Sequence, residues 1–220
     1  MENNLKLSEK LYMLSIRREK GGIPASVSNN LNYVLVGAFI LEMLQESAIK
    51  VQNKRIQIVS HPNGDEIHKL ILNKASGFKK NMRISYWIRR FFFTRVTLKK
   101  MLHDSMVSKK LISLEKKKFL FFRWDKPHIY NQKAIRGLHQ EITNGIFRGT
   151  EEEEQVTFLL LLSSLNIVNR LYGEKEKRGV ARKKLKALAA DPVVPESVKE
   201  VVKAVEMSIR AAHAAAAGAT

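Results

Sequence analysis

Apolar residues recur at helical spacing through the first part of the chain. We expect a first helix from Ser8, a candidate N-cap, to about Arg18, with Gly21 and Gly22 ending it. The stretch NNLNYVLVGAFILEMLQES, which starts at Asn29, keeps helical spacing but is apolar on most of its sides. A helix of this kind is typical of the centre of a bundle.

Alternation with a period of two then replaces the helical spacing. Between Ile49 and Ile58, apolar residues alternate with polar ones on either side of Asn53 and Lys54. This pattern predicts a short hairpin. The segment HPNGDEIHKLIL follows as a turn, with Asp65 as the candidate N-cap of the next helix.

Two apolar stripes with i, i+3, i+4 spacing predict two further helices. The first stripe lies in Ile84–Phe92 and the second in Leu98–Met106. The second helix carries Arg95, Lys99 and His103 away from its stripe, and we expect these three side chains to face water.

The segment KKLISLEKKKFLFFRWDKP combines dense positive charge with large apolar side chains. We expect a strand at Leu111–Leu114, a tight turn at EKKK and a second strand at Phe119–Trp124. In a strand, alternate side chains of Phe119–Phe122 would face opposite sides. Both sides are then apolar, so we expect one to pack inward and the other to contact lipid or another subunit.

The last third of the chain is predicted to be helical again. Thr150 and Glu153 have the spacing of a capping box before the apolar run VTFLLLLSSLNIVNRLY, which Gly173 ends. Two more helices should follow, one through RGVARKKLKALAA up to Pro192 and one from Pro195 through the alanine-rich end. The fold class expected is therefore mainly α, a single-domain helical bundle over residues 1–220 with small β-hairpins.

The hydropathy pattern indicates the location of the protein in the cell and how it associates with membranes. The apolar window VTFLLLLSSLNIV is shorter than the roughly 20 residues that a membrane span needs. The N-terminal apolar run is too short and too interrupted for a signal peptide. We therefore expect a cytoplasmic protein whose association with membranes is peripheral.

Positive charge is the strongest compositional feature. The chain has 39 lysines and arginines against 21 acidic residues, a net charge of +18. From Lys69 to Lys126 there are 17 basic residues and three acidic ones, which leaves +14 on this segment. Such an excess attracts anionic partners, of which lipid headgroups and nucleic-acid phosphates are the two obvious classes.

Motifs of catalysis and metal binding are missing from the sequence. There is no HExxH, no GxSxG, no glycine-rich phosphate loop and no cysteine. His61, Asp65 and His68 could be imagined as metal ligands, but Pro-Asn-Gly is a turn sequence and aspartate is an ordinary cap. We expect no enzymatic activity, no cofactor and no metal site.

Three kinds of partner remain open on the residues alone. An anionic membrane surface would attract the lysines while Leu120, Phe122 and Trp124 enter the headgroup region. A nucleic acid could bind a winged-helix arrangement, with Arg95, Lys99 and Lys100 at the phosphates and Lys116, Lys117 and Lys118 at the tip of the wing. A homo-oligomer formed through the hairpin is the third alternative, and Phe122→Asp should dissociate it.

Several motifs, in this order, resemble the Golgi phosphoprotein 3 family. They are LYMLSI followed by KGG, the helix LNYVLVGAFILEML, the turn PNGD, the hairpin LISLEKKKFLFF and the helix TFLLLLSSLNIVNRLYG. The resemblance covers nearly the whole chain, which is similar to the bacterial-type members. It implies a helical domain with a four-helix core, no enzymatic activity and peripheral membrane binding.

The resemblance also implies a ligand and a role. Eukaryotic members bind phosphatidylinositol 4-phosphate and act as adaptors, and the hairpin of the family is implicated in self-association. The tryptophan and arginine of the family's headgroup pocket correspond here to Val27 and Val36, and two further arginines to Val96 and Lys99. Lys99 is thus the matching cation, and with Arg95 and Lys100 it is the expected headgroup site. Nucleic-acid binding is the less favoured alternative.

Overall fold

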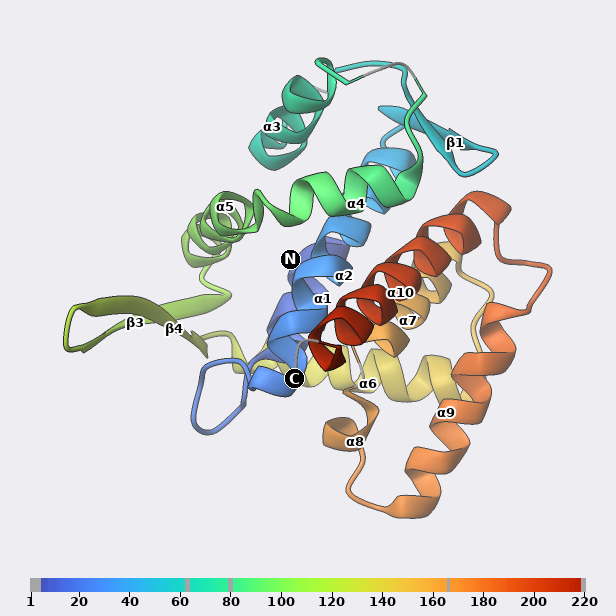
Figure 1. Cartoon of the computed structure of the whole chain (residues 1–220). Coiled ribbons are helices and arrows are strands. Elements are labelled where there is room, and N and C mark those ends of the chain that lie inside the picture. The colour runs from blue at the N-terminus through green and yellow to red at the C-terminus, as the bar shows by residue number, and fades with distance from the viewer. Residues whose placement is uncertain (1–4, 62–63, 79–80, 166, 219–220) are drawn as a thin grey trace.

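Helices make up most of the molecule, which confirms the predicted mainly α bundle with small β-hairpins. The computed structural model describes residues 5–61, 64–78, 81–165 and 167–218, and within these ranges it contains ten helices and two two-stranded antiparallel sheets. Figure 1 shows the helices gathered around α2, with the hairpin β3–β4 projecting from one side.

The elements have the following bounds. In chain order they are α1 (Leu7–Ser15), α2 (Ala25–Gln45), β1 (Ile49–Gln52), β2 (Arg55–Ile58), α3 (Glu66–Ala75), α4 (Ile84–Phe92), α5 (Arg95–Ser108), β3 (Ile112–Phe119), β4 (Phe122–Ile129), α6 (Gln132–Arg148), α7 (Glu153–Ser164), α8 (Val168–Leu171), α9 (Lys175–Ala189) and α10 (Glu196–Ala217).

Helix α2 is the centre of the core, as its pattern predicts. α1, α3, α4, α7 and α10 all pack against it. By length and hydropathy α2 could cross a membrane, but 72% of its apolar window is buried within this fold. Gly37 lies where α10 crosses α2, and a Cβ atom there would come within 2.5 Å of Cγ2 of Val205. The small residue therefore allows the two helices to approach closely.

A buried carboxylate joins α2 to two other helices. Oε1 of Glu42 accepts a hydrogen bond from the backbone N–H of Ser8 at 2.6 Å, and its Oε2 lies 3.0 Å from Nε2 of His68. Nδ1 of His68 lies 2.9 Å from Glu46. Burial by itself lowers the pKa of His68, but the hydrogen bond to Glu42 and the charges of Asp65, Glu42 and Glu46 outweigh it and raise the pKa. When His68 is protonated, Glu42 on one side of the ring and Glu46 on the other compensate its charge.

The helix starts differ from prediction at two caps. Ser8 is not an N-cap, because α1 starts one residue earlier. Glu9 accepts the N–H of Lys6, and the backbone N–H of Ser8 donates to Glu42. Thr150 does not form a capping box either, because its hydroxyl accepts the N–H of Glu152 and α7 starts only at Glu153. In both cases a local or tertiary hydrogen bond competes with the expected cap.

Two further differences concern the C-terminal half. The apolar run expected as one helix is two, since α7 ends at Ser164 and α8 begins at Val168. Helix α6 was not predicted, although Ile135, Leu138 and Ile142 have helical spacing and are buried. α9 and α10 form as predicted.

The small hairpin β1–β2 and the cap of α3 are confirmed. Asn53 and Lys54 make the turn with φ of 52° and 60°, and Gln52 pairs with Arg55. Asp65 caps α3 by accepting the N–H groups of Ile67 and His68 at 2.7 and 3.1 Å. The preceding turn at Pro62 and Asn63 lies outside the described residues.

The role of Gly37 in the packing gives a stability prediction. Gly37→Ala should lower the free energy of unfolding by about 1–3 kcal/mol, because the added methyl group overpacks the contact with Val205. Gly179→Ala, in α9, is the matched control: its Cβ meets no atom within 4 Å, so it should raise stability by about 0.5–1 kcal/mol through helix propensity. Chemical denaturation measures both, and equal effects of the two substitutions would contradict the packing.

Candidate functional site

The hairpin β3–β4 is longer than predicted and turns at a different place. Glu115–Lys118, expected as the turn, lie within strand β3, and the two-residue turn is Leu120 and Phe121. The pairs run from Ile112 with Ile129 to Phe119 with Phe122. The prediction of a turn at EKKK was therefore wrong, because the apolar pair at the base sets the register.

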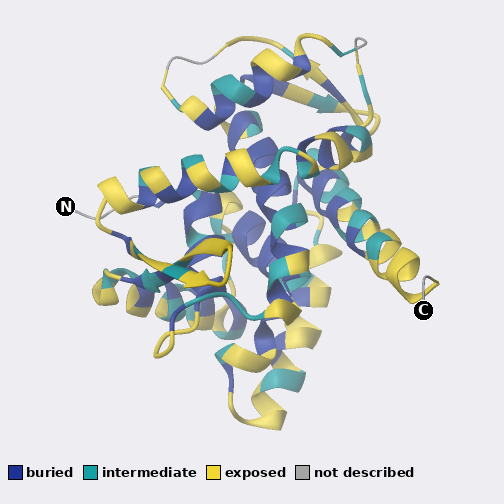
Figure 2. Ribbon diagram, turned by 60° about the vertical axis from the view of Figure 1, so that its left-hand side comes forward, coloured by how far each residue is buried: buried dark blue, intermediate teal, exposed yellow. Residues whose placement is uncertain are grey.

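Large apolar side chains occupy the tip of this hairpin and face solvent. Their exposed fractions are 65% for Phe119, 67% for Leu120, 96% for Phe121, 72% for Phe122 and 49% for Trp124. The expectation that one side of Phe119–Phe122 packs inward is wrong, since none of the four is buried. In Figure 2 the outer part of the hairpin is exposed, in contrast to the buried core behind it.

The cations of the hairpin fall on its two faces. Lys117 lies opposite Trp124 on the face that also carries Glu115, and Glu115 forms ion pairs with Lys117 at 2.5 Å and Lys126 at 3.8 Å. Hydrogen bonds from Lys117 and His128 lower the pKa of Glu115. Glu115 thus neutralises much of the positive charge on this face.

The opposite face keeps its positive charge. It carries Lys116, paired across the strands with Asp125, and Lys118, paired with Arg123 next to the tip. No carboxylate in the described part of the chain forms an ion pair with Lys116, Lys118 or Arg123. The tip is therefore an apolar end with cations beside it, and the placement of Lys116–Lys118 at the tip of a wing is wrong.

The loop after α1 holds the base of the hairpin. The N–H of Gly22 donates to the carbonyl of Pro127 at 2.7 Å, and the N–H of Arg17 to the carbonyl of Gly22 at 2.9 Å. Gly21 has a φ of 62° and passes so close to His128 that a Cβ atom would lie 2.4 Å from the imidazole ring. Glycines are required at this contact, and they fix the hairpin to the core at its base.

The three cations expected on α5 have different surroundings. The guanidinium of Arg95 lies 4.5 Å from the centroid of the Phe92 ring, and Phe92 stacks on Tyr33 at 4.3 Å. Lys100 is exposed and forms an ion pair with Asp104 at 3.3 Å. Lys99 is partly buried, and burial lowers its pKa.

His103 does not face water as expected. It is 5% exposed, and its Nε2 is hydrogen-bonded to the hydroxyl group of Tyr12 in α1. Burial, with the nearby charge of Lys99, lowers the pKa of His103 to about 4, while Asp125 of the hairpin acts in the opposite direction. The histidine is therefore neutral at pH 7 and belongs to the contact between α1 and α5.

The structure thus places the exposed apolar side chains of the hairpin together at its tip, while Arg95, Lys99 and Lys100 lie within two turns of α5 in different surroundings. Val27 and Val36 are each 2% exposed, so neither supplies a polar contact to a headgroup. Phe119, Phe121 and Arg123 are not among the predicted site residues. The FLFF run and the arginine that follows it are the sequence signal for them. Within the described ranges, no cluster of three or more His, Asp or Glu is placed to hold a metal ion.

Comparison with protein-family models gives one match. The family described as Golgi phosphoprotein 3 (GPP34) matches residues 7–205, which include every element from α1 to α9 and the first part of α10. A search among curated proteins returns no match.

The effect of the Lys99 charge on the pKa of His103 gives a prediction for NMR titration. Lys99→Gln should raise the pKa of His103 above about 4, because it removes a positive charge that disfavours the imidazolium. Lys100→Gln is the control, since Lys100 faces solvent on the same helix. A pKa of His103 that is unchanged by Lys99→Gln would show that the two side chains are not close.

Proposed function

The chain belongs to the Golgi phosphoprotein 3 family, and on that premise we propose that it is a non-enzymatic, peripheral membrane protein that binds anionic lipid surfaces. The tip of the β3–β4 hairpin enters the headgroup region, and the cations beside it contact the anionic headgroups. An adaptor or scaffold role, as in eukaryotic relatives, would follow from this attachment.

The observation that carries the proposal is the exposed apolar tip. Transfer of a fully exposed Phe or Leu side chain out of water contributes about 1.5–3 kcal/mol. Leu120, Phe121 and Phe122 together could therefore contribute on the order of 5 kcal/mol. This corresponds to weak, reversible attachment, so a second attraction is needed for stable binding.

Positive charge near the tip supplies that second attraction. Each Lys or Arg close to an anionic leaflet contributes about 1 kcal/mol. Lys116, Lys118 and Arg123 share one face of the hairpin and have no ion-pair partner among the described residues. Binding should therefore depend on both the apolar tip and the anionic lipid.

Headgroup selectivity is a finer part of the proposal. Lys99, Arg95 and Lys100 remain the proposed phosphate contacts on α5. Phosphatidylinositol 4-phosphate is the headgroup that the family suggests, but the apolar, buried Val27 and Val36 leave a site with fewer polar contacts. We therefore propose recognition of anionic headgroups in general, by charge and apolar insertion.

Self-association through the hairpin is the second candidate, because the same apolar tip could pair with another copy of the chain. A nucleic-acid role is less well supported, since the end of the hairpin is Leu120 and Phe121 rather than lysine. Light scattering and a gel-shift titration over salt distinguish these alternatives from lipid binding.

The proposal predicts the behaviour of a charge placed at the tip. Phe121→Asp should weaken binding to vesicles of phosphatidylcholine and phosphatidylserine at least tenfold, because it removes the most exposed apolar side chain and adds repulsion. Val193→Asp, at a residue 61% exposed outside the hairpin, is the matched control and should bind as wild type. Vesicle flotation measures all three proteins.

Two results would overturn the proposal. Equal recovery of the wild type with neutral and anionic vesicles would exclude recognition of anionic lipid. A multimer that Phe122→Asp dissociates, together with no binding to either vesicle, would assign the tip to self-association.

A further inference from the structure

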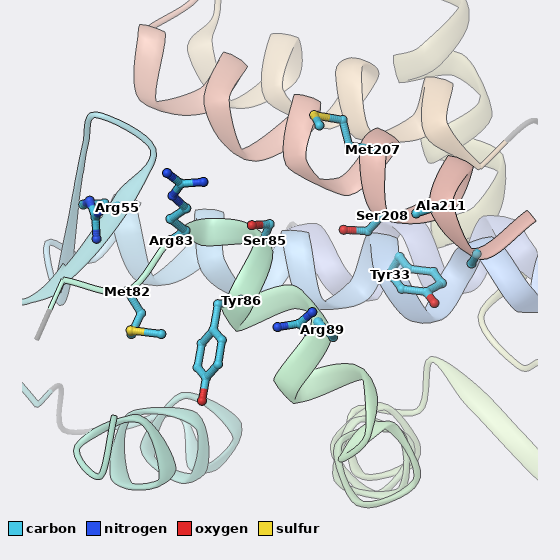
Figure 3. Close-up of a pocket in the computed structure, with 11 residues that line it drawn as sticks. Tyr33, Arg55, Met82, Arg83, Ser85, Tyr86, Arg89, Met207, Ser208 and Ala211 are labelled. Carbon is cyan, nitrogen blue, oxygen red and sulfur yellow. The ribbon is translucent and has the colours of Figure 1, made fainter. Parts of the chain in front are cut away.

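A second basic surface lies away from the hairpin, in a groove between α4 and α10. Its volume is about 610 Å³, and its floor includes Tyr33 of α2. Figure 3 shows Arg83, Ser85 and Arg89 along α4, facing Met207, Ser208 and Ala211 on α10, with Arg55 at one end. The residues that line this groove include three arginines and no acidic side chain.

Backbone hydrogen bonds hold two of these arginines side by side. Arg55 and Arg83 are partners in an antiparallel bridge between β2 and the segment before α4. On either side of it, the N–H of Ile56 donates to the carbonyl of Met82 at 2.9 Å, and the N–H of Ile84 to that of Lys54 at 3.0 Å. Directly paired residues of an antiparallel bridge point to the same side, where like charges repel.

No carboxylate within the described ranges forms an ion pair that relieves this repulsion. Arg55 donates to the carbonyl of Asn81 at 2.8 Å, which fixes its guanidinium, and Arg89 lies 6.0 Å from the ring centroid of Tyr86. An adjoining hollow shares Arg55, Arg83 and Ser85 with this groove and is also lined by Glu196, Glu200 and Glu206 of α10. Glu200 accepts the backbone N–H of Lys54, and none of the three acids forms an ion pair with Arg55 or Arg83 among the described residues. The repulsion at the bridge is the feature that a bound anion would relieve.

Unpaired donors point to the same chemistry. Arg83 is the N-cap of the nine-residue helix α4, and Ser85 is its second residue. Neither the N–H nor the hydroxyl of Ser85 donates to an acceptor in the described part of the chain. The helix dipole favours an anion at this end. Planar guanidinium groups match phosphate oxygens in pairs, and a phosphate offers more acceptors than a carboxylate.

We infer that this groove binds a phosphate monoester, with the phosphate between Arg55, Arg83 and Ser85. The organic part of the ligand lies between α4 and α10, along Met207 and Ser208 toward Arg89. A volume of about 610 Å³ is within the range of small-molecule sites. The source of the monoester is either a soluble metabolite or the headgroup of a lipid such as phosphatidic acid.

An NMR titration with phenyl phosphate, in a buffer free of phosphate, tests the soluble source. The amide signals of Ser85 and Tyr86 should shift, and Arg83→Gln should weaken the binding about tenfold through loss of a charge-assisted hydrogen bond. Arg90→Gln is the matched control, because Arg90 is an exposed arginine of the same helix that does not line the groove. Phenylacetate, the carboxylate analogue, should bind more weakly than phenyl phosphate.

Vesicles test the lipid source. If the monoester is a headgroup, Arg83→Gln should reduce binding to phosphatidic acid vesicles and leave binding to phosphatidylglycerol vesicles of equal charge unchanged. An effect on phenyl phosphate alone would assign the site to a soluble ligand. If Arg83→Gln changes neither, or no more than Arg90→Gln does, the inference is overturned. Phe121→Asp should leave the affinity for phenyl phosphate unchanged. The experiments therefore test this inference independently of the proposed membrane contact of the hairpin.

Discussion

Close packing around α2 is the constraint on which the rest of the structure depends. Gly37 allows α10 to approach at one side of this helix, and Glu42 binds the first turn of α1 and His68 of α3 at another. Removing one partner from such a buried, charged network costs far more than removing an exposed ion pair. The position of α1 is therefore set by a polar contact as well as by its apolar side.

The position of α1 in turn determines how the hairpin is held. The loop after α1 binds Pro127 through Gly22 and passes under His128 at Gly21, so the base of the hairpin belongs to the core. Among the residues that the structure describes, none supports the outer half of the hairpin in a comparable way, and Phe121 there is almost fully exposed. A rigid base with a free apolar tip is the arrangement that a membrane-contacting element needs, since little order has to be gained on binding.

The sequence pattern correctly predicts those elements whose formation depends only on residues close together in the chain. The stripe of α4, the cap at Asp65 and the turn at Asn53 and Lys54 follow from periodicity and turn chemistry. The pattern could not place His103, because its burial depends on Tyr12, far away in the sequence. The predicted turn at EKKK is wrong because a hydrophilic run does not by itself determine a turn, whereas strand pairing at the base of the hairpin sets the register. The bridge between Arg55 and Arg83 is a tertiary contact that no short window contains.

Tryptophan fluorescence tests the central claim most directly, because the chain has two tryptophans in opposite environments. Trp124 lies on the hairpin and is 49% exposed, while Trp87 is 2% exposed in the core. Addition of anionic vesicles should shift the emission of the wild type to shorter wavelength, and brominated acyl chains should quench it. Trp124→Phe should abolish both effects. An emission spectrum that anionic vesicles leave unchanged, or an equal shift in Trp124→Phe, would contradict insertion of the hairpin.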